Sequence, residues 1–169
     1  MIQYIIIIIS SFITFFIFNK ISYRLNLLDI PSKRKKHDVP VPYTGGFSIG
    51  IVFLIIVLII DFNTKTLNFL LTYSFLISIC GLIDDKYNLG VGSKLCLELV
   101  PILILIFLTN LVLEDIGTYE ILGQIKLGSF NLIFTVLCVL LLINSVNYVD
   151  GIDGSACMTT VSSLFLLLL

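Results

Sequence analysis

Long apolar runs separated by short polar segments dominate the chain from its second residue onward. A helix needs roughly 20 mostly apolar residues to cross the hydrocarbon of a bilayer. Five runs approach this length and predict membrane-spanning helices, and a sixth begins near Ala156 and continues to the last residue. The five runs are Ile2–Phe18, Gly46–Ile60, Leu67–Ile83, Leu95–Leu113 and Phe130–Val146. The pattern therefore predicts an all-α fold, a polytopic bundle of transmembrane helices.

Both ends of the sequence are apolar. The first run has no basic residue before it and no small-residue cleavage site after it, so it is predicted to be a membrane helix and not a signal peptide. The last run, Leu164–Leu169, stops within a helix, where the final carbonyl groups would lack partners in lipid. We therefore expect residues 1–169 to be a single integral membrane domain and the N-terminal part of a longer protein.

The composition excludes a soluble globular protein. Hydrophobic residues make up 58% of the chain and charged residues only 12%, and the mean hydropathy is +1.12. Soluble domains carry about a quarter charged residues. The net charge of −1 gives no reason to expect a nucleic-acid partner. The four cysteines form no CxxC pair, and His37 is the single histidine, so a zinc framework or a His-rich metal site is not expected.

Lysine and arginine are distributed unevenly among the loops. Of the 10 basic residues, six lie in residues 19–45 and two in residues 84–94. Cytoplasmic loops are enriched in basic residues. This distribution predicts an N-terminus outside the cytoplasm, with these two loops and residues 147–155 inside it.

Two adjacent carboxylates, Asp84 and Asp85, follow the third apolar run on the predicted cytoplasmic side. Neighbouring carboxylates repel and are stable as anions only near a cation or hydrogen-bond donors. Mg²⁺ typically binds one or two carboxylates together with substrate phosphates. A magnesium site is therefore one interpretation, and a solvated helix end is the other.

A second acidic segment follows the fifth apolar run. Asp150 and Asp153 would share a face if the helix continued, and Gly151 lets the backbone approach an anion. An ordinary interhelical turn is the alternative. The segment does not match the EF-hand template, since Ile152 stands where that loop needs an oxygen ligand.

Four further polar side chains border these segments. Asn144 and Asn147 either join helices or form a hydrogen-bonding wall for a polar substrate. Lys94 either forms a local ion pair with Glu98, four residues on, or binds a phosphate while Glu98 holds it in place. His37, in a lysine-rich loop, is either a solvated residue or part of a site. Together these segments favour metal-assisted chemistry on a phosphorylated substrate.

Three motifs are similar to those of the polyprenyl-phosphate N-acetylhexosamine-1-phosphate transferases, members of glycosyltransferase family 4. The pattern H-x-x-P-x-P-x-x-G-G is matched by His37, Pro40, Pro42, Gly45 and Gly46. The pattern G-x-x-D-D is matched by Gly81, Asp84 and Asp85. The pattern N-x-x-N-x-x-D-G-x-D-G is matched by Asn144, Asn147, Asp150, Gly151, Asp153 and Gly154. The histidine-type first motif is closer to the GlcNAc-1-phosphate branch than to the muramoyl-pentapeptide branch.

The resemblance implies an activity and a set of site residues. N-acetylhexosamine-1-phosphate, GlcNAc-1-phosphate in this branch, would pass from a UDP-sugar to polyprenyl (undecaprenyl) phosphate, releasing UMP, with Mg²⁺ or Mn²⁺ as cofactor. This is the first membrane step of cell-envelope glycan synthesis. Taken together with the residue chemistry above, it gives as candidate site residues Asp150, Asp153 and Asp85 for catalysis, Asp84 and Asp85 for metal binding, and His37, Lys94, Asn144, Asn147 and Gly151 for substrate binding.

The resemblance also implies a place in the cell. We expect a multi-pass protein of the bacterial cytoplasmic membrane, with the lipid bilayer as its surroundings, its site loops on the cytoplasmic face, and a homodimer as one assembly to test. Three alternatives stay open: the pentapeptide-transferase branch, a catalytically incomplete fragment, and an ion-coupled transporter. The last would place acids in mid-span, whereas here they cluster at helix ends.

Overall fold

The computed structural model describes residues 2–30, 39–60, 64–121, 123–149 and 155–167. The chain divides into two compact units, Met1–Asn110 and Leu111–Leu169, which are described separately. The first unit contains α1 (Ile2–Leu25), β1 (Leu28–Asp29), β2 (Val41–Pro42), α2 (Gly45–Ile59), α3 (Lys65–Tyr87) and α4 (Val91–Thr109). The second contains β3 (Asp115–Tyr119), β4 (Gly123–Lys126), the short 3-10 helix η1 (Gly128–Phe130), α5 (Asn131–Val149) and α6 (Ser155–Leu167).

The prediction of an all-α polytopic membrane protein is confirmed. Four described helices, α1, α3, α4 and α5 extended by η1, are long and apolar enough to cross a membrane. Helix α2 is apolar but has only 15 residues, which at 1.5 Å per residue is about 22 Å, against a hydrocarbon thickness of about 30 Å. Helix α6 has 13 residues within the described range.

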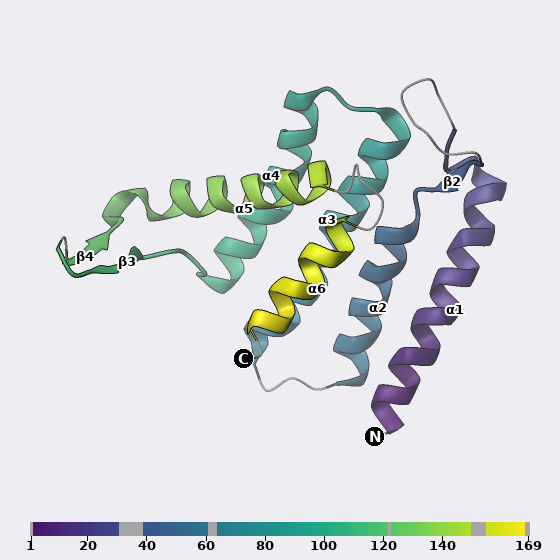
Figure 1. Ribbon diagram of the computed structural model, residues 1–169, viewed down its shortest axis with the longest axis horizontal. Helices are drawn as coiled ribbons and strands as arrows, with labels where there is room; N and C mark the ends of the chain where they lie inside the picture. Colours follow the sequence, from purple (N-terminus) through teal and green to yellow (C-terminus); the bar gives the residue numbers. More distant parts are fainter. Residues whose placement is uncertain (1, 31–38, 61–63, 122, 150–154, 168–169) are drawn as a thin grey trace. The chain divides into compact units, whose positions relative to one another are not determined.

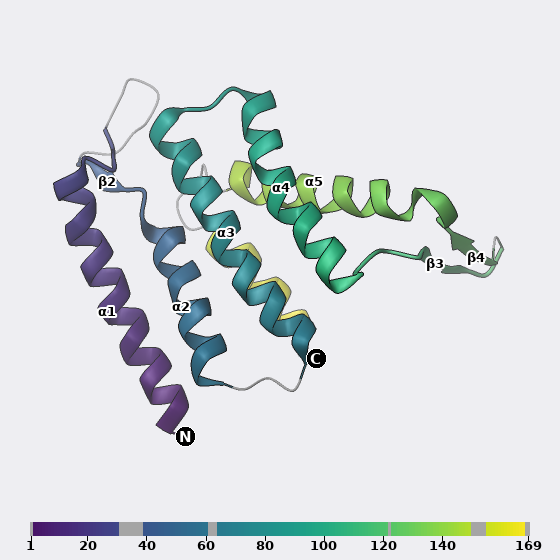
Figure 2. The same cartoon turned by 180° about the vertical axis from the view of Figure 1, so that it is seen from behind.

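The four helices of the first unit pack in chain order, α1 against α2, α2 against α3 and α3 against α4. Successive helices run in opposite directions (Figures 1 and 2). As a result, the end of α1, the start of α2, the end of α3 and the start of α4 all lie at one end of this unit. That end carries the Gly45-Gly46 and Asp84-Asp85 segments.

The contact between α2 and α3 is close because α2 has a glycine where the helices meet. Gly50 is buried, and a Cβ atom built on it would lie 2.4 Å from Ser78 Oγ and 3.2 Å from Phe75 Cα. The Phe47 ring lies 5.1 Å from that of Phe18 and 5.5 Å from that of Phe75, so aromatic contacts join α1, α2 and α3. Small residues at helix crossings are typical of membrane bundles, where close backbone packing replaces the hydrophobic effect.

Helices α3 and α4 end at asparagines. Asn88 and Asn110 adopt the left-handed conformation, with φ of 47° and 53°, and each donates its backbone N–H to the carbonyl four residues earlier. The predicted continuation of the fourth span to Leu113 is wrong, because the left-handed Asn110 ends α4 at Thr109. Pro101 lies buried inside a continuous helix, as membrane helices tolerate.

The second unit begins with an antiparallel hairpin that the sequence analysis did not predict. β3 pairs with β4 in the register Asp115↔Lys126, Thr118↔Gln124 and Tyr119↔Gly123, with a bulge between the first two pairs. The hairpin leads through η1 into α5, and α5 contacts α6. The predicted fifth span, Phe130–Val146, is confirmed, although the helix continues to Val149.

Candidate active site

The two adjacent aspartates lie in the last turn of α3. The N–H of Asn88 donates to the Asp84 carbonyl over 2.7 Å, which closes the helix directly after them. The Asp84 side chain is half-buried, whereas that of Asp85 is exposed. Consecutive residues point about 100° apart around a helix. The two carboxylates therefore face different surroundings.

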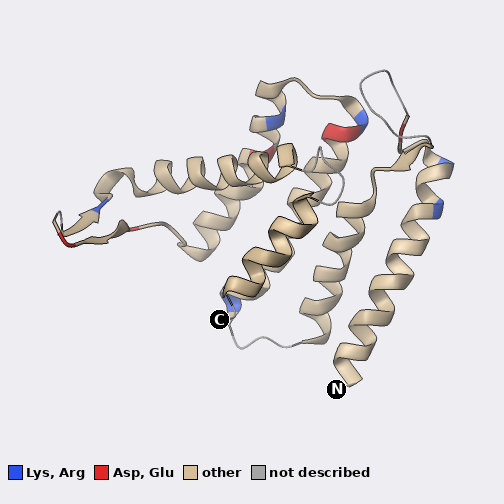
Figure 3. Cartoon of the chain, viewed as in Figure 1, with Lys and Arg blue, Asp and Glu red and all other residues tan. Residues whose placement is uncertain are grey.

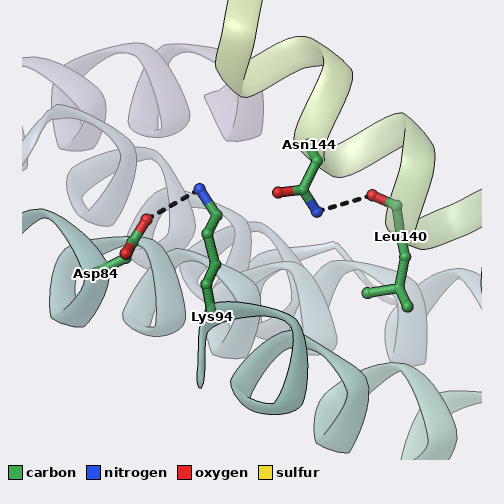
Figure 4. Close-up of polar contacts among 4 residues, drawn as sticks. All are labelled: Asp84, Lys94, Leu140 and Asn144. Carbon is green, nitrogen blue, oxygen red and sulfur yellow. Dashed lines mark hydrogen bonds and ion pairs between the residues drawn. The ribbon is translucent and has the colours of Figure 1, made fainter. Parts of the chain in front are cut away.

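Lys94 provides the partner of Asp84. Its Nζ lies 2.9 Å from Asp84 Oδ2, and the two side chains are only 18% and 17% exposed (Figure 4). The short connection between α3 and α4 turns the chain back, so that the last turn of one helix faces the first turn of the next. The sequence analysis considered only Glu98, one turn away on the same helix, as a partner of Lys94. It did not find this interhelical pair.

Both charges of the ion pair lie at the unfavourable ends of their helices. A carboxylate is disfavoured at a helix C-terminus and a lysine at an N-terminus, because each meets a partial charge of its own sign. The pair offsets this repulsion. It also keeps an ammonium group beside a carboxylate at the end of the bundle, an arrangement able to bind an anion next to an acidic group.

Glu98 is one turn deeper in α4 and is buried. The neighbouring contact between the helices is a hydrogen bond of 3.5 Å from the Cys80 thiol to the Leu97 carbonyl. Glu98 therefore lies within the α3–α4 packing layer beneath the ion pair.

A buried hydroxyl pair fixes the start of α2. Ser22, fully buried, lies 2.8 Å from Thr44 Oγ1, and Thr44 Oγ1 donates to the Phe18 carbonyl at 3.2 Å. A backbone bond from Tyr43 N–H to the Leu27 carbonyl continues this contact. The Ser22–Thr44 pair thus attaches the Gly45-Gly46 segment to α1. Sequence reasoning missed this contact. The threonine before the helix start is a familiar capping signal, but the Thr44 side chain makes no capping bond here and contacts α1 instead.

Basic side chains gather at the same end of the first unit. Lys20 and Arg24 lie in the last turns of α1, Lys86 in the last turn of α3 and Lys94 in the first turn of α4. Lys65 begins α3 at the opposite end (Figure 3). This grouping gives this end of the unit an attraction for anions.

The second unit carries the two asparagines near the end of α5. Asn144 Nδ2 donates to the Leu140 carbonyl at 2.9 Å within the same helix (Figure 4), and Asn147, one turn later, is exposed. Both amides therefore lie in the last turns before the acidic segment. His37, Asp150, Gly151 and Asp153 are outside the described residues.

Within the described ranges, no group of three or more His, Cys, Asp or Glu side chains is arranged to hold a metal ion. The described residues do include the adjacent carboxylates of Asp84 and Asp85. One or two carboxylates are the usual protein share of a magnesium site completed by substrate phosphates and water. Asp84 and Asp85 therefore fit such an ion in donor type, with Asp84 paired to Lys94 in this structure.

Comparison with known proteins gives a consistent result. Residues 66–169 match the model of the family described as glycosyl transferase family 4. This range includes Asp84, Asp85, Lys94 and both asparagines. No solved structure matches the chain.

Several bacterial proteins are similar over most of the chain. A probable undecaprenyl-phosphate N-acetylglucosaminyl 1-phosphate transferase of Bacillus subtilis is 32% identical over 149 residues, which cover 88% of this chain and 41% of that protein. An undecaprenyl-phosphate alpha-N-acetylglucosaminyl 1-phosphate transferase of Escherichia coli K12 is 29% identical over 150 residues, which cover 86% of this chain and 40% of that protein. The chain thus spans about two fifths of the length of these curated relatives.

Proposed function

Because the chain belongs to glycosyl transferase family 4, we propose that it forms part of an enzyme that transfers N-acetylglucosamine-1-phosphate from a UDP-sugar to undecaprenyl phosphate and releases UMP. The relatives' names support this donor sugar and lipid acceptor. The enzyme would act in the bacterial cytoplasmic membrane, with the end of the first unit that carries Asp84 and Lys94 at the cytoplasmic face.

The ion pair between Asp84 and Lys94 is the observation that carries the proposal. The reaction joins two anionic phosphate groups at the membrane surface, so the site needs cationic groups to hold them and an acidic group nearby. Lys94 supplies an ammonium at the end of the bundle, held 2.9 Å from a carboxylate. An arriving diphosphate would share or replace Asp84 as its partner.

Other residues of this chain would orient the substrates. The amides of Asn144 and Asn147 can donate and accept hydrogen bonds to the uridine or the sugar. The Ser22–Thr44 pair would hold the Gly45-Gly46 turn in place, where exposed backbone N–H groups at a helix start favour phosphate. His37, Asp150, Asp153 and Gly151 are proposed to complete the site on the basis of the family motifs.

Asp84 and Asp85 would hold Mg²⁺ or Mn²⁺. When bound there, such an ion neutralises charge on the diphosphate and on the departing UMP. Asp85, exposed at the end of α3, would meet substrate from the water side.

A transfer assay tests this proposal. Membranes containing the product of the complete reading frame receive undecaprenyl phosphate, Mg²⁺ and radiolabelled UDP-GlcNAc, and label in extracted lipid is counted. Asp85→Asn should abolish transfer while leaving membrane expression unchanged. Glu120→Gln, a matched loss of charge in the turn of the β3–β4 hairpin, should leave it intact. Absence of labelled lipid with the unmodified protein, or full transfer by Asp85→Asn, would overturn the assignment.

A further inference from the structure

The β3–β4 hairpin has one polar and one apolar face. Thr118 pairs with Gln124, and Gln124 Nε2 donates to Asp115 Oδ2 at 2.7 Å, which places these three side chains on the same face. On the other face, the Tyr119 ring lies 4.0 Å from a Cβ built on Gly117, and its hydroxyl donates to the Ile116 carbonyl. Ile116 follows Asp115 directly, so strand alternation places it on this second face, and the bulge after it returns Thr118 to the polar face. The hairpin is therefore amphipathic.

The apolar face continues to the tip of the hairpin. Ile121 in the turn is 95% exposed, and Ile116 and Tyr119 are about half exposed. Nearly full exposure of a large aliphatic side chain is unfavourable in water, and an apolar patch that continues over a strand and a turn marks an interaction surface.

Hydrogen bonds attach the base of the hairpin to a membrane span. Leu113 N–H donates to Thr135 Oγ1 at 2.9 Å, and Thr135 is buried in the second turn of α5. Leu127 N–H donates to the Glu114 carbonyl at 2.9 Å, which closes the base of the hairpin. The apolar face is thus held next to the first turns of α5, at the level where a spanning helix leaves the hydrocarbon.

We propose that the β3–β4 hairpin docks onto the headgroup zone of the bilayer, with Ile121, Tyr119 and Ile116 entering the lipid and Asp115, Thr118 and Gln124 facing water. Its two strands leave backbone N–H and C=O groups open at both edges, so it cannot enter the hydrocarbon core. Tyrosine prefers the membrane–water interface. The segment has three acids, Glu114, Asp115 and Glu120, against Lys126, so a zwitterionic lipid suits it better than an anionic one.

The absence of tryptophan from the sequence allows a direct test. Ile121→Trp and Thr118→Trp each place a single fluorophore on the hairpin, the first at the apolar tip and the second on the polar face. The variants of the whole chain are placed in nanodiscs of phosphatidylcholine, which leave both membrane surfaces open to solution. Emission is then measured with phosphatidylcholine brominated on its acyl chains and, separately, with acrylamide, whose neutrality avoids bias from the nearby acids.

The expected result is a blue-shifted emission from Ile121→Trp that brominated lipid quenches and acrylamide does not. Thr118→Trp should show the reverse. Equal acrylamide quenching of both variants would place the tip in water and overturn the proposal. Protection of Ile121→Trp from both quenchers would mean that protein covers the tip, which would also overturn it. Strong bromolipid quenching of Thr118→Trp would contradict the assignment of the faces. None of these outcomes depends on the proposed transferase activity.

Discussion

The tight crossing of α2 and α3 makes Gly50→Ala a sharp test of the packing in the first unit. The new Cβ would lie 2.4 Å from Ser78 Oγ, 3.1 Å from Ser78 Cβ and 3.2 Å from Phe75 Cα. Rotation of the serine hydroxyl could relieve the first contact, at the expense of its bond to the Phe75 carbonyl. The other two contacts involve the helix backbone or an atom fixed to it, so the helices must separate by a few tenths of an ångström.

The size of the effect follows from two opposing contributions. Overpacking of this kind costs about 1–3 kcal/mol. Replacing a helical glycine with alanine returns up to about 1 kcal/mol through backbone entropy. We therefore expect Gly50→Ala to lower the free energy of unfolding by about 1–2 kcal/mol. SDS titration of the purified chain, followed by circular dichroism, measures this quantity.

Two companion variants make the result interpretable. Gly46 lies in the same helix with nothing within 4 Å of a built Cβ, so Gly46→Ala should be neutral or stabilising. Adding Ser78→Ala to Gly50→Ala removes the shortest contact and should recover part of the loss. Equal free energies of unfolding for Gly46→Ala and Gly50→Ala would refute the close crossing, and so would a double variant no more stable than Gly50→Ala alone.

Three further substitutions probe other contacts. Thr44→Val keeps the shape of the side chain but leaves the fully buried Ser22 hydroxyl without its partner. SDS titration should show that the free energy of unfolding falls by about 1–3 kcal/mol. Recovery of stability in Thr44→Ser would show that the loss comes from the missing hydroxyl. Lys94→Gln removes the partner of Asp84 and should raise the KM for UDP-sugar in the transfer assay, whereas an unchanged KM would argue against phosphate binding by this lysine. Thr135→Val removes the acceptor of the Leu113 N–H and should speed hydrogen exchange at that amide; unchanged exchange would contradict the attachment of the hairpin to α5.

The sequence predicts the helices of this protein well, because apolar length is a strong signal for a membrane span. It predicts their ends less well. Asn110 ends α4 through its backbone conformation, although the apolar residues continue beyond it. The β3–β4 hairpin was missed because its strands have only five and four residues. A bulge also disturbs their alternation of polar and apolar positions.

The candidate site was predictable in its residue types but not in its contacts. The G-x-x-D-D motif identified Asp84, and Lys94 was a candidate phosphate-binding lysine. The partner that helical periodicity suggested for Lys94 was Glu98, on the same helix. The observed pair depends on how the turn at Asn88 redirects the chain, which no local pattern encodes. The Ser22–Thr44 contact joins residues 22 positions apart and was invisible for the same reason.

The Asp84–Lys94 pair has its acid at the end of α3 and its base at the start of α4. Stability alone does not explain this order of the two charges. Exchanging the two residues, by Asp84→Lys with Lys94→Asp, would keep an ion pair between α3 and α4 and would place each charge at the favourable end of its helix. Each such placement is worth about 0.3–1 kcal/mol, so the exchanged protein should be at least as resistant to SDS as the original. The chain nevertheless carries the less favourable arrangement, and departures from a local rule are expected at functional sites. If the carboxylate is needed beside Asp85 and the ammonium at the start of α4, the exchange should abolish transfer without loss of stability. If transfer survives the exchange, the ion pair has only a structural role, as a contact between α3 and α4.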